Sequence, residues 1–175
     1  MNKYETTMQR FWAGFVDGLI FIPLGWLESW VYSTARPVAF LIVWMLFSYP
    51  VYWLYSVLMH GFCGQTLGKM ALKVKVLDLS EAPISMRQAF LRDSVYIVIN
   101  TAALILSIYF TLSGRETDVD SFLQANAILG TTALLWFVAE ILTCLTNAKR
   151  RAVHDYIAGT VVVRTEYLPA EAGEV

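Results

Sequence analysis

The chain has 175 residues, of which 57% are hydrophobic and 15% are charged, and its net charge is −1. Soluble domains carry about a quarter charged residues, so this composition excludes an ordinary soluble protein and indicates an integral membrane protein. The near-zero net charge provides no basic field for nucleic acid, which we do not expect as a partner.

Four windows are apolar enough to cross the hydrocarbon core of a bilayer, which requires a helix of about 20 residues. In chain order these windows are residues 11–32, 38–59, 94–113 and 125–146. The predicted fold is therefore an all-α membrane protein. We expect a four-transmembrane-helix bundle that forms a single domain over residues 1–175.

The connections between these spans differ in charge. The N-terminal segment, the loop at residues 60–93 and the tail at residues 147–175 hold 11 of the 13 Lys and Arg residues, and the other two loops hold only Arg36 and Arg115. Loops rich in Lys and Arg remain in the cytoplasm. Both termini, the loop and the tail are therefore predicted to be cytoplasmic. The acidic residues Glu116 and Asp118 share the opposite side with Arg115.

Two segments of the cytoplasmic part have the pattern of short strands. Residues 72–78 alternate apolar and basic side chains, and residues 159–165 are a second β-branched run of similar length. Because a lone strand is unstable, we predict that they pair into a small two-stranded cytoplasmic cap.

A short helix is predicted just before the third span. Ser85 can act as its N-cap, and the apolar residues up to Arg92 share one face. We expect this helix to lie at the membrane surface, with Arg87 and Arg92 facing phosphate headgroups.

Several ionisable or polar residues fall inside the spans, where a carboxylate rarely persists without a partner or a water path. Arg10, Asp17 and Glu28 are spaced to share one face of a helix. Glu140 in the fourth span and Asn100 in the third provide further polar groups. We predict that these five residues form a polar core, which serves an ion or proton or, alternatively, only holds the helices together.

The first span also contains residues that affect helix packing. Gly14 and Gly18 have the small-xxx-small spacing that lets another helix approach closely. Pro23 and Gly25 are expected to loosen the backbone beyond Asp17.

Three motifs resemble those of the RDD family of membrane proteins, which is named for one arginine and two aspartates. They are Arg10-Phe11-Trp12-Ala13 followed by Asp17, Gly64-Gln65-Thr66-Leu67-Gly68-Lys69, and the segment from Arg151 to Val162 that contains His154-Asp155. The resemblance implies that Asp155 is the second aspartate. It also implies that Gln65, Lys69, His154 and Asp155 belong to cytoplasmic motifs.

The resemblance implies a helical membrane domain, in the bacterial inner (cytoplasmic) membrane, and a role in transport. Some members are linked to sodium/proton exchange and others to scaffolding in membrane-protein quality control. From the residues, Asp155 can cap a short helix or pair with Arg10, Arg150 or Arg151. We hypothesise that Arg10 bridges Asp17 and Asp155.

An enzyme is not expected. The glycine-flanked turn at residues 64–69 lacks the spacing of a phosphate-binding loop. His154-Asp155 has no neighbouring Ser or Cys nucleophile, and His60 and Cys63 do not have metal-ligand spacing. We therefore predict no cofactor and no metal.

Two functions remain. The first is transport of an ion or small solute, such as cation/proton exchange, with Asp17 as the embedded carboxylate and a monovalent cation or proton as its partner. Four helices enclose little volume, so this function requires a homo-oligomer. The second is a non-transporting scaffold or assembly factor that binds another membrane protein.

Overall fold

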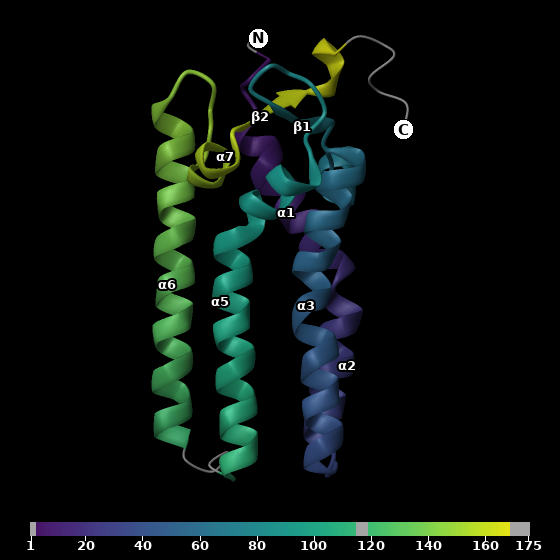
Figure 1. The fold of residues 1–175 in the computed structure, drawn as a ribbon, viewed down its shortest axis with the longest axis vertical. Coiled ribbons are helices and arrows are strands. Elements are labelled where there is room, and N and C mark those ends of the chain that lie inside the picture. Colours follow the sequence, from purple (N-terminus) through teal and green to yellow (C-terminus); the bar gives the residue numbers. More distant parts are fainter. Residues whose placement is uncertain (1–2, 115–118, 169–175) are drawn as a thin grey trace.

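The computed structural model describes residues 3–114 and 119–168, and it is a bundle of long helices with a small folded layer at one end (Figure 1). The long helices are α3 (Val38–Cys63), α5 (Met86–Ser113) and α6 (Val119–Thr146). They run beside one another, and α3 packs mainly on α5.

Among the described residues, these three helices are long and apolar enough to cross a membrane. A fourth span is formed if α1 (Thr7–Ile20) and α2 (Ile22–Ser33) count together as one bent span. The predicted number of four spans is therefore reached only with this pair.

The first predicted span is not one continuous helix. α1 ends at Ile20, and α2 begins at Ile22 at an angle of 44°. Pro23 lies in the first turn of α2, where its missing N–H is tolerated, whereas in a continuous helix its ring would clash with the preceding turn. The break at Phe21 agrees with the predicted loosening, but it interrupts the single polar face that was expected to join Asp17 to Glu28.

The third span starts earlier than expected. The segment that was predicted to be a separate interfacial helix is instead the beginning of α5, which runs without interruption from Met86. Ser85 is its N-cap as predicted: the Ser85 hydroxyl accepts a hydrogen bond from the Gln88 backbone N–H, and the Gln88 side chain accepts one from the Ser85 N–H. The loop residues Arg115, Glu116 and Asp118 lie outside the described residues.

A two-stranded antiparallel sheet joins β1 (Val74–Asp78) to β2 (Thr160–Arg164), with Val76 opposite Val162. The predicted pairing of the two strands is therefore confirmed. The valines of the sheet are fully buried, and Val76 and Val162 pack against Val57 of α3 and Ala89 of α5.

Three short elements complete this end of the bundle: α4 (Leu67–Ala71), α7 (Val153–Ala158) and a 3-10 turn (Thr165–Tyr167). The two described ends of the chain also meet here, because the Arg164 backbone N–H donates to the Lys3 carbonyl over 3.1 Å. We call this region the sheet end of the bundle (Figure 1).

Candidate functional site

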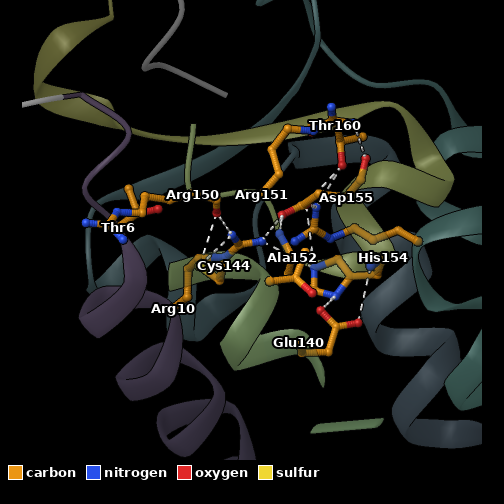
Figure 2. A network of polar contacts seen from close by, with 12 residues as sticks. Thr6, Arg10, Glu140, Cys144, Arg150, Arg151, Ala152, His154, Asp155 and Thr160 are labelled. Atoms are coloured by element: carbon orange, nitrogen blue, oxygen red, sulfur yellow. Dashed lines mark hydrogen bonds and ion pairs between the residues drawn. The ribbon is translucent and has the colours of Figure 1, made fainter. Parts of the chain in front are cut away.

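Asp155 is the centre of a buried polar network at the sheet end (Figure 2). Its side chain is 0% exposed, and its two oxygens form ion pairs with Arg10 of α1 and Arg92 of α5. The carboxylate also accepts hydrogen bonds from the Ala152 backbone N–H (2.9 Å) and the Thr160 hydroxyl (3.0 Å), so it caps α7 and holds the start of β2. One carboxylate thus joins two membrane helices to the C-terminal layer.

The charge of Asp155 is fixed by these neighbours. Burial alone would disfavour the ionised form. The positive charges of Arg10 and Arg92 outweigh the effect of burial, and they hold the pKa of Asp155 well below its usual range.

The predicted pairing of Asp155 with Arg10 is confirmed, as is its alternative role as a helix cap. Arg10 also donates to the Arg150 carbonyl over 2.7 Å. Arg151 reaches the Asp155 main-chain carbonyl (2.9 Å) rather than its carboxylate. Within the described part of the chain, Arg10 does not contact Asp17, so the hypothesis that it bridges both aspartates is only half right.

Arg92 is the partner that sequence reasoning missed. It was expected to face lipid headgroups, but it is buried, and it donates to both Asp155 and the Thr160 hydroxyl. Arg87, one turn earlier in α5, is exposed. Periodicity could have separated the two arginines, because only Arg92 shares a face with the buried Ala89, but it could not have named a partner 63 residues away.

Asp17 is only 5% exposed, and it ties α4 to α1. Its carboxylate accepts three hydrogen bonds: from the Tyr55 hydroxyl (2.8 Å), the Thr66 hydroxyl (2.6 Å) and the Gly68 backbone N–H (2.8 Å). The two family motifs that contain Asp17 and Gly68 therefore contact each other directly.

The backbones of α1 and α4 also approach each other closely here. A Cβ on Gly68 would lie 2.1 Å from the Ala13 carbonyl oxygen, so only glycine fits. A Cβ on Gly14 or Gly18 would meet nothing within 4 Å. The expected close helix approach at Gly14 and Gly18 is thus absent from the described residues.

Substitutions of Asp17 separate its charge from its hydrogen bonds. Asp17→Ala leaves three donors without an acceptor, and we expect it to lower the free energy of unfolding by about 2–3 kcal/mol. Asp17→Asn can keep all three contacts if the Thr66 hydroxyl accepts instead of donating, so its effect should be about 1 kcal/mol or less. Denaturation of the purified protein in detergent tests this difference. Equal losses in the two variants would contradict the proposed bonding.

Lys69 belongs to a second polar cluster. Its ammonium nitrogen lies 2.5 Å from His60 Nε2, and His60 Nδ1 lies 3.7 Å from the Asp93 carboxylate. Ser56 donates to the same carboxylate over 2.8 Å. Burial, followed by the charge of Arg92, lowers the pKa of Lys69 to about 7. Gln65, from the same motif, instead donates to the Val74 carbonyl (2.9 Å) and fixes the turn to β1.

Lys69 should make stability depend on pH. Between the folded-state pKa of about 7 and the usual value of 10.5, the unfolded chain holds a proton that the folded chain has lost, so the free energy of unfolding rises with pH. We expect Lys69→Met to remove up to about 1.4 kcal/mol per pH unit of this rise, as measured by denaturation at several pH values. Lys73→Met, at an exposed position, should leave the slope unchanged. An unchanged slope in Lys69→Met would show that Lys69 titrates normally.

Glu140 connects α6 to α7 through His154. Glu140 Oε2 lies 2.6 Å from His154 Nδ1, and the His154 backbone N–H donates to Glu140 Oε1 over 3.2 Å (Figure 2). Burial, followed by the charge of Arg92, lowers the pKa of His154. The imidazole therefore favours its neutral form, in which one nitrogen donates and the other accepts.

These groups line a cavity of about 560 Å³ between α1, α3, α5 and α6, which we call the sheet-side cavity. It contains five of the predicted site residues: Arg10, Asp17, Lys69, Glu140 and His154. A second cavity of about 580 Å³ lies between α2, α3 and α5 in the opposite half of the bundle, and it contains Glu28 and Asn100. We call it the far cavity. The predicted polar core is thus divided into two sites.

Tyr52 lines both cavities. Its ring packs edge-on against Phe21 with 5.2 Å between ring centroids, and Phe21 makes a similar contact with Tyr55 at 5.3 Å. The break between α1 and α2 therefore lies at the boundary between the two cavities.

Comparison with known protein families gives a match over most of the chain. The model of the RDD family matches residues 4–159, which contain every predicted site residue. No curated protein and no solved structure matches the chain.

Proposed function

The chain belongs to the RDD family, and from this premise we propose that it carries an ion or small solute across the membrane by means of an embedded carboxylate. One observation carries the proposal: two cavities occupy opposite halves of the bundle and share Tyr52 beside a helix break. Membrane transporters commonly place binding sites at discontinuous helices, where irregular backbone lines a cavity.

The charges of the sheet-side cavity favour a cation. Arg10 and Arg92 are both paired with Asp155, which does not line the cavity. The remaining lining charges are the carboxylates of Asp17, Asp93 and Glu140, with Lys69 as the nearby base. Arg10, Arg92 and Asp155 together carry one positive charge, so with three acids and Lys69 the site as a whole has one excess negative charge.

Lys69 offers a means of coupling the cation to a proton. Its pKa of about 7 means that it loses its charge near neutral pH. When it is neutral, the cavity is more negative and attracts a monovalent cation more strongly. Proton release from Lys69 and cation binding would then favour each other, which is the requirement for cation/proton exchange.

The proposal places the sheet end in the cytoplasm, because the connections there hold most of the Lys and Arg residues. The far cavity would then open toward the other side of a bacterial inner membrane. Few helices surround either cavity, so we propose that a homo-oligomer completes the path.

Flux through proteoliposomes tests the function. Vesicles that contain the purified protein and an internal pH dye are exposed to gradients of Na⁺ or K⁺. We expect proton flux in the wild type and its loss in Asp17→Asn and Glu140→Gln, with both variants still folded. Glu166→Gln, which changes an exposed acid outside both cavities, is the matched control.

The opposite result is equally informative. A folded wild type that moves no proton against any of several monovalent cations would contradict exchange. A role as a scaffold or assembly factor for another membrane protein would then be the remaining candidate.

A further inference from the structure

The far cavity has walls that differ from those of the sheet-side cavity. Its lining includes five aromatic side chains: Phe21, Tyr32, Tyr49, Tyr52 and Phe110. Glu28 is the only acid that lines it, and no Lys, Arg or His among the described residues does so. The cavity therefore combines aromatic faces with a single carboxylate.

Two polar groups of this cavity lack partners. Ser48 is only 5% exposed, and its hydroxyl forms no hydrogen bond within residues 3–114 and 119–168. Glu28, which is half-buried, has no hydrogen bond or ion pair within that part of the chain. Buried polar atoms are nearly always paired in folded proteins, so an unpaired hydroxyl on a cavity wall indicates that a ligand or water completes it.

The size of the cavity selects the class of ligand. A volume of about 580 Å³ is typical of sites for small organic molecules, and it greatly exceeds the space that one monovalent ion needs. Aromatic faces attract cations through their negative π-surfaces, and they recognise alkylated ammonium groups in particular. A carboxylate supplies the counter-charge.

We propose that the far cavity binds a small organic ammonium ion, with its cationic head between the Glu28 carboxylate and the aromatic rings. The Ser48 hydroxyl is placed to hydrogen-bond a polar substituent of the same ligand. The assignment of this ion as the transported solute rests on the proposed function. The binding itself does not.

Equilibrium binding tests the proposal. The full chain, purified in a non-ionic detergent, is titrated calorimetrically with choline and with 3,3-dimethylbutan-1-ol, which has nearly the same shape but no charge. We expect choline to bind at least about tenfold more tightly than the neutral analogue. Equal affinities would overturn the proposal, and they would indicate an apolar groove that accepts lipid.

Variants locate the site. Glu28→Gln should weaken choline binding on the order of tenfold, because it removes the counter-charge. Tyr32→Leu should weaken it roughly threefold to tenfold, whereas Tyr32→Phe keeps the aromatic face and should bind nearly as the wild type does. Asp120→Asn, which changes an exposed acid in the first turn of α6, is the control for loss of charge.

The two Tyr32 variants keep the test decisive if Glu28→Gln does not fold. Choline binding that neither Glu28→Gln nor Tyr32→Leu weakens would overturn the assignment. Binding without transport would sustain the site and contradict the proposed function, and cation/proton flux without choline binding would do the reverse.

Discussion

Asp155→Asn is expected to lower the free energy of unfolding by about 3–5 kcal/mol. The carboxylate is fully buried between Arg10 and Arg92, and it also caps α7. An amide of the same shape leaves two buried guanidinium groups without a counter-charge. Chemical denaturation of the purified protein in detergent measures the loss.

Two further variants establish the cause. Arg87→Met, at the exposed arginine of the same helix, should change stability by less than about 0.5 kcal/mol. Adding Arg92→Met to Asp155→Asn removes one of the uncompensated charges, so the double variant should be less destabilised than the sum of the single changes. Strict additivity would mean that the ion pair contributes little.

Gly68→Ala is expected to destabilise the protein by about 3 kcal/mol or more. Its new methyl group would lie 2.1 Å from the Ala13 carbonyl oxygen and 2.9 Å from Asp17 Cγ. Because the first contact is with backbone, α4 must move away from α1, and the hydrogen bonds of Asp17 then break. Thermal unfolding and limited proteolysis near residues 64–73 should both detect this change.

The matched control is Gly18→Ala. A Cβ at this position meets nothing within 4 Å, and alanine is favoured over glycine inside a helix. Its stability should be unchanged or greater by up to about 1 kcal/mol. A similar loss in both variants would show that α1 is sensitive to any substitution, rather than that α4 approaches it closely.

Hydropathy and periodicity predicted most of the fold because they report local properties. Apolar length located α3 and α6, alternation located β1, and a β-branched run located β2. The start of α5 was missed, since its first turns carry Arg87, Arg92 and Asp93, which makes them too polar for a span by composition. Tertiary ion pairing, which composition does not reveal, allows Arg92 to be buried there.

The site was harder to predict for the same reason. Asp17 could be singled out as a carboxylate inside a predicted span, but its partners Tyr55, Thr66 and Gly68 lie 38–51 residues away. Glu28 lies about three helical turns beyond Asp17 and past the break at Phe21, so it lines the far cavity instead. The residues alone left Arg10, Arg150 and Arg151 as possible partners of Asp155, and the ion pair with Arg10 was among these alternatives.

The pairing of Arg10 with Asp155 also has a consequence for biosynthesis. Arg10 and Arg92 are synthesised long before Asp155, with which they form ion pairs. Strand β1 is likewise synthesised long before its partner β2. The helices can therefore enter the bilayer in sequence, and Arg10 and Arg92 remain without the Asp155 carboxylate until the end of synthesis. A nascent chain interrupted before Asp155 would carry two guanidinium groups without this counter-charge and an unpaired edge on β1, which is a template for aggregation.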